Sequence, residues 1–244
     1  MRSQSGLFVI EGTRLCFDAY KSGVEFETVF VTENFIKKFN EDVIKISNSA
    51  KETYMVTEEI MKHICDTVNP QGIVCVCKNV VSKFDIKENS KFTVLVDVQD
   101  PANVGTISRT AEALGIDALI VCGGCDIYNP KALRASMGAL FRLPVLQMNT
   151  QEMFEFLESN NIKSFASTPR DTAKELNKTS FDGKCAMLIG NEANGLSDEI
   201  IEKCETAVTI QMLGRAESLN AAAAASVLMY EMMRGSLWKM QFIG

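Results

Sequence analysis

Continuous apolar runs recur along the second half of this chain, and they constrain its fold more than any other feature. Phe92–Val98, Ala118–Cys122 and Cys185–Ile189 lack the alternation of a half-exposed strand. Such runs are typical of strands buried on both faces of a parallel sheet. A helical pattern over Asn103–Leu114, ended by Gly115, connects the first two runs. The sequence therefore predicts a βαβ unit within an α/β domain.

The same alternation of strands and helices extends over the rest of the chain. Further strands are predicted at Leu7–Ile10, Thr28–Val31, Val43–Ile46, Gly72–Cys77, Lys163–Ser167 and Ala207–Met212. Further helices are predicted at Thr13–Lys21, Thr57–Ile64, Glu152–Glu158 and Ser218–Arg234. Residues 82–91 are polar and lack helical periodicity, which is typical of a linker. We therefore predict a smaller α/β domain over residues 1–81 and a larger one over residues 92–244.

Composition narrows the class of protein. The 244 residues carry a formal net charge of −6, which argues against non-specific coating of nucleic acid but leaves selective binding open. The chain has one histidine, His63, and eight scattered cysteines, so we expect reduced thiols and no metal site. For the lone CxxC pair, Cys122 and Cys125, packing at a strand end is favoured over metal or redox chemistry. No apolar stretch reaches the roughly 18 residues of a membrane span, and we expect a cytoplasmic protein.

Unusual polar loops follow three of the predicted strands, and ligands of open α/β sheets bind beyond the carboxyl ends of strands. In the first loop, Asn103 is predicted to cap the following helix and Gly105 to allow close approach of a backbone or a phosphate. Arg109 is predicted to project from the second helical turn. Considered without the other motifs, Asn103 is equally consistent with an ordinary helix cap. Considered in the same way, Arg109 is consistent with a solvated surface side chain. Neither GxGxxG nor a P-loop sequence is present.

The second and third loops follow the predicted strands at 185–189 and 207–212. In the second, Gly190 and Gly195 bracket Glu192, which could hydrogen-bond a hydroxyl or a base edge; a structural turn is the alternative. In the third, Ser218 is predicted as a helix N-cap, and Asn220 as a buried amide that needs hydrogen-bond partners. The alanines at 221–225 predict a closely packed helix face.

Together these loops match a known pattern. Asn-x-Gly-x-x-x-Arg from Asn103, Gly-Asn-Glu-x-x-Gly-Leu from Gly190 and Gly-x-x-Glu-Ser-Leu-Asn from Gly214 resemble, in order and spacing, three family motifs. These are the motifs of the SpoU/TrmH family of RNA ribose 2′-O-methyltransferases, within the SPOUT superfamily. The likeness covers about residues 92–235. In the first half of the chain, residues 6–15 and 69–73 resemble the substrate-binding domain of this family, which is similar to ribosomal protein L30e.

The resemblance implies a fold and an activity. The fold would be a SPOUT parallel-sheet domain with a deep trefoil knot after an L30e-like α/β domain, although general rules of chain topology favour an unknotted sheet. The activity would be S-adenosylmethionine-dependent methylation of a ribose 2′-hydroxyl in structured RNA by a homodimer. The additional N-terminal domain favours 23S ribosomal RNA over tRNA. The alternatives are a tRNA ribose 2′-O-methyltransferase, a non-catalytic knotted RNA-binding protein and a small-molecule binder unrelated to RNA.

The resemblance also implies roles for individual residues. The residues expected to orient the ribose and carry the reaction are Arg109, Asn103, Glu192, Ser218 and Asn220. Those expected to contact the cofactor are Thr168, Gly190, Ile210 and Leu219. Because guanidinium is almost never deprotonated, we expect Arg109 to hold the target phosphate rather than to act as the base. Residues 127–151 contain no Asp or Glu, and the cations expected to contact RNA there are Lys131, Arg134 and Arg142.

Two loop positions depart from the family pattern. Gln211 stands where proline is usual, and Ala193 stands where glycine is usual. We expect Gln211 to leave the backbone beside the cofactor less rigid, because it lacks the fixed φ of proline. Neither departure removes a polar group that the reaction needs.

Overall fold

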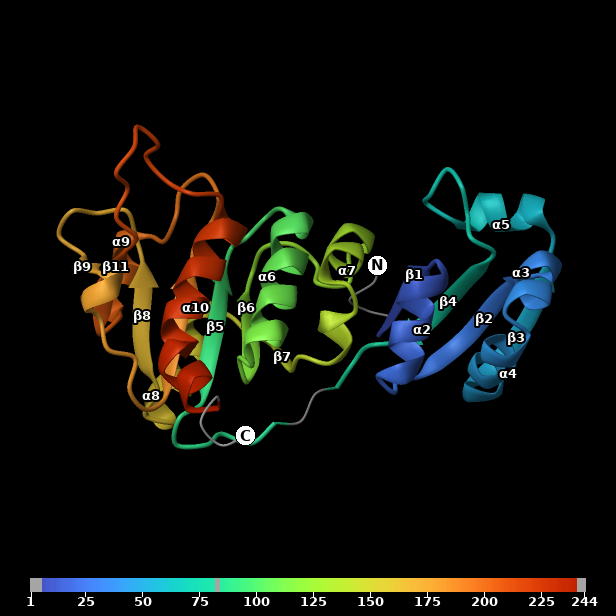
Figure 1. Cartoon of the computed structure of the whole chain (residues 1–244), viewed down its shortest axis with the longest axis horizontal. Helices are drawn as coiled ribbons and strands as arrows, with labels where there is room; N and C mark the ends of the chain where they lie inside the picture. The colour runs from blue at the N-terminus through green and yellow to red at the C-terminus, as the bar shows by residue number, and fades with distance from the viewer. Residues whose placement is uncertain (1–5, 82–83, 241–244) are drawn as a thin grey trace. The chain divides into compact units, whose positions relative to one another are not determined.

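The computed structural model describes residues 6–81 and 84–240, and the chain divides into two compact units after Val81 (Figure 1). Residues 82 and 83 of the predicted linker lie outside the described residues. The predicted linker also runs one residue too far, because Lys91 is the first residue of a buried strand. Among the described helices, none is long and apolar enough to cross a membrane.

A seven-stranded sheet forms the centre of the second unit. Its strands are β5 (Lys91–Val96), β6 (Ala118–Cys122), β7 (Val145–Gln147), β8 (Lys163–Ser167), β9 (Lys174–Glu175), β10 (Cys185–Ile189) and β11 (Thr206–Thr209). They lie in the order β7-β6-β5-β10-β8-β11-β9, and each neighbouring pair is parallel. Every residue of β5, β6 and β10 is buried, as their continuous apolar runs predict. Because the sheet is parallel, the carboxyl ends of its strands share one edge.

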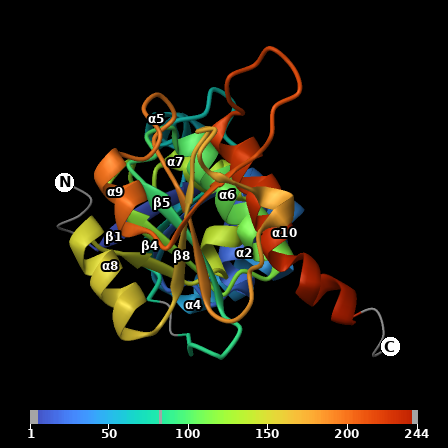
Figure 2. The same cartoon turned by 90° about the vertical axis from the view of Figure 1, so that its left-hand side faces the viewer.

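Helices cover both faces of this sheet (Figure 2). One face carries α6 (Pro101–Leu114), α7 (Pro130–Ser136) and α10 (Ala221–Met240), and the other carries α8 (Thr150–Ser159) and α9 (Asp198–Lys203). Two short 3-10 turns are η1 (Ala139–Phe141) and η2 (Leu176–Lys178). On the α8 face, Phe92, Ile120 and Leu188 form a buried cluster with Met153 and Leu157. This core holds the strands in register beneath the loops at their carboxyl ends.

Gly105 brings α6 and α7 into close contact. A Cβ at this position would lie 2.3 Å from the carbonyl oxygen of Ala132 and 2.6 Å from the Cβ of Ala135. The close approach predicted for Gly105 is therefore that of another backbone. On its other side, α6 packs against α10, where the hydroxyls of Thr110 and Ser226 lie 3.3 Å apart.

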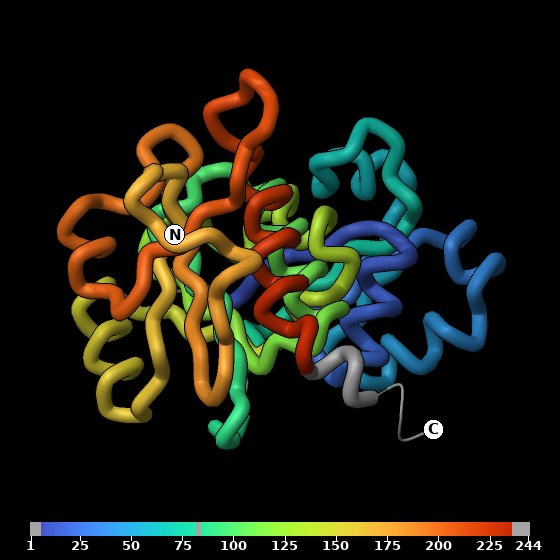
Figure 3. Tube along the Cα trace, turned by 60° about the vertical axis from the view of Figure 1, so that its left-hand side comes forward, coloured from blue at the N-terminus to red at the C-terminus, as the bar shows by residue number. Residues whose placement is uncertain are grey.

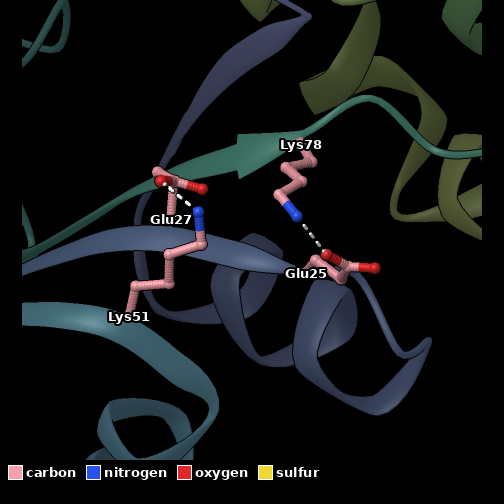
Figure 4. A network of polar contacts seen from close by, with 4 residues as sticks. All are labelled: Glu25, Glu27, Lys51 and Lys78. Atoms are coloured by element: carbon pink, nitrogen blue, oxygen red, sulfur yellow. Dashed lines mark hydrogen bonds and ion pairs between the residues drawn. The ribbon is translucent and has the colours of Figure 1, made fainter.

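The first unit is a smaller α/β domain with a mixed four-stranded sheet. Its strands are β1 (Leu7–Glu11), β2 (Phe26–Thr32), β3 (Ala50–Val56) and β4 (Ile73–Lys78), and its helices are α2 (Thr13–Lys21), α3 (Glu33–Lys38), α4 (Asn40–Ser49) and α5 (Glu58–Ile64). The strand order is β1-β4-β2-β3, with β2 and β3 parallel and the other pairs antiparallel. Two ion pairs of 2.6 Å, Glu27–Lys51 and Glu25–Lys78, connect β2 and the residue preceding it to β3 and β4 (Figure 4). The cations on this part of the domain are thus paired with carboxylates.

Several predicted ranges differ from the structure, and one predicted element is of the wrong type. Val43–Ile46 is part of α4 rather than a strand, and Val43 and Ile46 are buried together because they lie about one helical turn apart. Strand β11 ends at Thr209 instead of Met212. Helix α10 begins at Ala221, three residues later than predicted.

Candidate active site

Thr168, Gly190 and Ile210 lie at the carboxyl edge of the parallel sheet. Thr168 follows β8 and Gly190 follows β10, and the register of these two strands places them beside each other. The backbone N–H of Thr168 donates to the carbonyl of Val208 over 3.0 Å, so the end of β11, with Ile210 one residue beyond it, lies next to β8. The structure therefore brings together three of the four residues expected at the cofactor.

The loop after β10 folds back on itself at Gly190. A Cβ at Gly190 would lie 2.2 Å from the carbonyl carbon of Gly195, so a side chain cannot be accommodated there. Asn191 and Gly195 pair through two backbone hydrogen bonds of 3.1 and 2.8 Å, and Gly195 has a φ of 65°. Gly195 thus has the left-handed backbone that favours glycine, whereas glycine is required at position 190 by close packing.

The Glu192 carboxylate holds the start of α6. Its Oε2 accepts a hydrogen bond from the backbone N–H of Gln99 at 3.0 Å. Its Oε1 accepts from the backbone N–H of Asp100 at 3.0 Å and from Nδ2 of Asn103 at 2.9 Å. Both carboxylate oxygens are thus used within the chain, so Glu192 joins the second loop to the first.

These hydrogen bonds also set the charge state of Glu192. Burial by itself would raise the pKa of this carboxyl, but the donors from Asn103, Gln99 and Asp100 favour the charged form more strongly. The pKa of Glu192 consequently lies below its ordinary value, and the side chain is a carboxylate at neutral pH. It accepts hydrogen bonds there and has no proton to donate.

Asn103 is not the N-cap of α6, contrary to the prediction. Asp100 has that role, since its side chain accepts from the backbone N–H of Ala102 at 2.9 Å and Pro101 is the first helical residue. Asn103 is buried inside the first turn, and its Oδ1 accepts a hydrogen bond from Nδ2 of Asn220 at 3.1 Å. The buried amide therefore connects Glu192 on one side to Asn220 on the other.

Asn220 is the N-cap of α10. Its Oδ1 accepts from the backbone N–H groups of Ala222 and Ala223, at 2.9 and 3.3 Å. The predicted cap, Ser218, lies two residues earlier and is exposed. Asn220 is also exposed rather than buried, but both ends of its amide have the partners that the prediction required. The chain of contacts from Glu192 through Asn103 to Asn220 joins all three loops.

The segment 211–219 projects from this edge of the domain (Figure 3). All of its residues except Met212 are exposed, and Leu213 is 100% exposed. Within the described part of the chain, the side chains of this segment make no hydrogen bond or ion pair. The structure therefore does not bring Leu219, which is 38% exposed, or Ser218 to the strand ends at Thr168 and Gly190.

Arg109 lies on another side of α6 from Asn103. Six residues rotate the helix by about 240° beyond one full turn, so the two side chains diverge by about 120°. Arg109 is exposed, and among residues 6–81 and 84–240 its guanidinium makes no hydrogen bond or ion pair. The structure thus leaves Arg109 outside the network formed by the other motif residues of its own chain.

The three cations expected to contact RNA differ in their surroundings. Lys131 and Arg134 are exposed on α7. Arg142, which follows η1, forms an ion pair of 2.8 Å with Glu112 of α6. The charge of Arg142 is therefore largely balanced within the domain.

Cys122 and Cys125 are free thiols at the end of β6. Burial, with help from the carboxylates of Asp97 and Asp126 respectively, raises the pKa of each thiol to about 11. Thiols with such high pKa values are poor nucleophiles and poor metal ligands at neutral pH. In the described ranges, no group of His, Cys, Asp and Glu side chains is arranged to hold a metal ion.

Sequence reasoning missed two contributors to this edge of the sheet. The side chain of Asn191 donates to the carbonyl of Asp97 at 2.9 Å, and the ion pair Arg170–Asp198 joins the loop after β8 to the first residue of α9. Asn191 lies within the second motif, so the signal was available. Nothing in the local sequence indicates the Arg170–Asp198 pair, because its partners are 28 residues apart.

Two protein-family profiles match this chain. The profile of the SpoU rRNA Methylase family matches residues 90–230, which include the whole parallel sheet and all three loops. The profile of the MRM3-like substrate binding domain matches residues 1–75, within the first unit.

Similar proteins of known name extend over nearly the full chain. The 23S rRNA (guanosine(2553)-2′-O)-methyltransferase RlmP of Bacillus subtilis is 32% identical over 95% of this chain and 90% of its own length. The 23S rRNA (uridine(2479)-2′-O)-methyltransferase of Streptomyces viridochromogenes is 29% identical over 96% and 84%. The mitochondrial rRNA methyltransferase 3 of Xenopus laevis is 28% identical over 94% and 70%.

Solved structures show the same arrangement. The AdoMet-bound rRNA methyltransferase of Sinorhizobium meliloti superposes with a TM-score of 0.86 at 26% identity, covering 96% of this chain and 89% of that one. A structure concerned with 2′-OH methylation of C/U34 on tRNA covers only 60% of this chain, with 95% of its own length and a TM-score of 0.54. The α/β fold with a parallel SPOUT sheet is thus confirmed. Because the SpoU profile alone spans more than half of its residues, this chain belongs to the SpoU rRNA methylase family.

Proposed function

We propose that this chain transfers the methyl group of S-adenosylmethionine to a ribose 2′-hydroxyl of 23S ribosomal RNA. The observation that carries the proposal is the hydrogen-bonded chain from Glu192 through Asn103 to Asn220, which joins three loops at the ligand-binding edge of a parallel sheet. The two relatives that act on 23S rRNA, from Bacillus and Streptomyces, align with nearly all of this chain. The shorter tRNA-related structure lacks a counterpart for much of it.

The strand ends at Thr168, Gly190 and Ile210 suit a cofactor held mainly by main-chain groups. Gly190 has no side chain to obstruct the loop after β10. Thr168, which is buried, lies beside it and carries a hydroxyl. S-adenosylmethionine supplies an electrophilic methyl group when bound. Leu219 would join these residues only after the segment 211–219 folds down onto the edge. The absence of proline at Gln211 favours such movement, because the backbone there is less restricted.

The chain itself must position the ribose and dispose of the hydroxyl proton. In this proposal Arg109 binds the phosphate of the target nucleotide and does not act as the base, because a guanidinium keeps its protons. The proton passes to that phosphate or to solvent. Asn103 and Glu192 hold the first turn of the helix that carries Arg109, while Ser218 and Asn220 orient the ribose from the third loop.

We further propose that the active site is completed in a homodimer. Arg109 points away from the Asn103 network of its own chain, so the site it serves is that of a second copy. The chain would also carry the trefoil knot of the SPOUT superfamily. In support, β10 lies between β5 and β8, and the chain returns after β11 to pack α10 on α6 and β5.

The domain at residues 1–81 is proposed to bind the RNA substrate, with the domain at 92–244 carrying the reaction. Lys131, Arg134 and Arg142 would contact phosphates of the RNA, and Arg142 would have to leave its ion pair with Glu112 to do so. Because few phosphates are neutralised, binding should depend only modestly on salt. The cytoplasm is the proposed location.

The decisive experiment measures transfer of tritium from labelled S-adenosylmethionine to 23S rRNA transcribed in vitro, followed by mapping of the 2′-O-methylated nucleotide. We expect activity in the wild type and its loss in R109A. Calorimetric titration with S-adenosylhomocysteine should give equal affinity for both proteins. Transfer by R109A at the wild-type rate would remove the role of Arg109, and failure of the wild type to bind S-adenosylhomocysteine would favour a non-catalytic RNA-binding protein.

A further inference from the structure

Asn191 uses every polar atom of its side chain between two loops. Its Oδ1 accepts from the backbone N–H groups of Ala193 and Asn194, at 2.9 and 3.1 Å, which closes the turn after β10. Its Nδ2 donates to the carbonyl of Asp97 at 2.9 Å, which lies in the loop between β5 and α6. The amide oxygen therefore stabilises the loop after β10, and the amide nitrogen binds the loop between β5 and α6.

The residue that Asn191 holds has an unusual backbone. Asp97 has a φ of 54°, in the left-handed region that residues with a Cβ seldom occupy. Its N–H donates to the carbonyl of Cys122 at 2.9 Å, and a Cβ on Gly123 would lie 2.6 Å from its Oδ1. Such a conformation persists only where the surroundings over-determine it. The hydrogen bond from Asn191 is one of the contacts that fix Asp97 here.

The loop that begins at Asp97 leads directly into the first turn of α6. Glu192 holds the far end of this loop through the N–H groups of Gln99 and Asp100. Asn191 and Glu192 are consecutive, and together they hold both ends of the segment 97–100. The position of Asn103, three residues further on, follows from that segment.

We propose that Asn191 is a positioning residue for methyl transfer, acting on the start of α6 through Asp97 and not on the cofactor. This inference rests on the proposed function, but the contact itself does not. Displacement of catalytic groups by about 1 Å costs up to about 100-fold in rate, so loss of this contact should reduce turnover.

The test compares two variants with the same change of charge in the same loop. N191D keeps an oxygen for the N–H groups of Ala193 and Asn194 but places a second oxygen against the carbonyl of Asp97. N194D is the control, because the Asn194 side chain makes no hydrogen bond in the described part of the chain. We expect kcat for methyl transfer to 23S rRNA to fall about tenfold or more in N191D relative to N194D. The affinity for S-adenosylhomocysteine should differ by less than about threefold.

Hydrogen exchange gives a readout that does not require activity. The amides of Gln99 and Asp100 should exchange faster in N191D than in N194D, because their loop has lost one of its two attachments. If N191D shows no cooperative melting, N191S takes its place, since a serine hydroxyl can close the turn but is too short to reach Asp97. Equal kcat and equal exchange in the two variants would overturn the proposal. So would a loss of S-adenosylhomocysteine affinity as large as the loss of kcat. If the wild type methylates no RNA, the proposed function fails, and the exchange rates still decide whether Asn191 holds the loop.

Discussion

The amide of Asn220 donates a hydrogen bond of 3.1 Å to Oδ1 of Asn103, although the two residues are 117 positions apart in the chain. Asn103 in turn donates to Glu192 through its Nδ2. One buried amide thus lies between the N-cap of α10 and the carboxylate that holds the start of α6. Its orientation is determined by partners on both sides, because only the nitrogen can donate and only the oxygen can accept.

Replacement of Asn103 by Asp should disrupt this arrangement. N103D could still accept from Asn220 but could not donate to Glu192, and it would bury a second carboxylate beside the first. We expect kcat for methyl transfer to fall about 100-fold, since the groups at the start of α6 would move. T106A is the control, because Thr106 lies about one turn beyond Asn103 in α6 but is exposed. This variant should retain wild-type turnover. A kcat for N103D within twofold of T106A would contradict the assigned role.

The charge of Glu192 should make the stability of the site depend on pH. The pKa of Glu192 is lower in the folded chain than the value of about 4.3 expected in the unfolded chain. The carboxylate therefore makes its full contribution to the unfolding free energy above that value. The contribution is lost as pH falls through the lower folded pKa. We expect the difference in unfolding free energy between wild type and E192Q to be constant above about pH 5 and to shrink below about pH 4. Urea unfolding at several pH values measures this difference in unfolding free energy. A difference that stays constant to the lowest pH at which both proteins fold would contradict the prediction.

Gly105 should be intolerant of a side chain. G105A would place a methyl group 2.3 Å from the carbonyl oxygen of Ala132, and both helices would have to separate. We expect a loss of about 3 kcal/mol in unfolding free energy, at the upper end for overpacking because the obstacle is backbone. G214A is the control, because a Cβ there meets nothing within 4 Å. Denaturant unfolding that gave equal stabilities would show that α6 and α7 can separate without cost.

A shared active site predicts complementation between inactive chains. R109A should leave the cofactor residues intact, and G190A should lose cofactor binding because the loop after β10 cannot close. In a mixed dimer, one site combines an intact cofactor edge with an intact Arg109. Random mixing should therefore restore about a quarter of wild-type methyl transfer. The matched control mixes R109A with the double variant R109A/G190A, and it should stay inactive. No recovery in the first mixture would place Arg109 and the cofactor in one chain.

The ion pair Arg170–Asp198 should give a small, salt-dependent contribution to cofactor binding. The Arg170 side chain is 44% exposed and that of Asp198 is 76% exposed, and such pairs contribute about 0–1 kcal/mol. We expect R170Q to weaken S-adenosylhomocysteine binding about threefold in low salt and not at all near 0.5 M salt. K203Q, which breaks the pair Lys203–Glu199 within α9, is the control. The reversed pair R170D/D198R should recover affinity; if it does not, Arg170 acts on the cofactor directly.

Several elements could be predicted from the sequence because their signals are local. The predicted ranges of α2 and of strands β6, β8 and β10 agree with the structure, since helical periodicity and continuous apolar runs depend on neighbouring residues. The strand predicted at Val43–Ile46 is wrong, because this short apolar run belongs to a longer helix whose other residues are polar. Val43 and Ile46 are three apart, which is the spacing of a helix face.

The errors at the site have a common origin. The sequence predicts Asn103 and Ser218 as caps because both residue types suit an N-cap. The caps in the structure are Asp100 and Asn220, which are equally suitable by type. For α6 the position of Pro101 was an available signal. For α10 the choice depends on where the helix begins, and the alanine run allows several starting points.

The sequence by itself determined that three polar loops meet at one edge of a buried parallel sheet, because continuous apolar runs separated by helices leave few other arrangements. It also determined the residue types in those loops. Only the tertiary structure decided which atoms pair: Glu192 with Asn103, Asn103 with Asn220, and Asn191 with Asp97. The physical reason is that a hydrogen bond depends on distance and angle between groups far apart in the chain, and packing of the whole domain sets both.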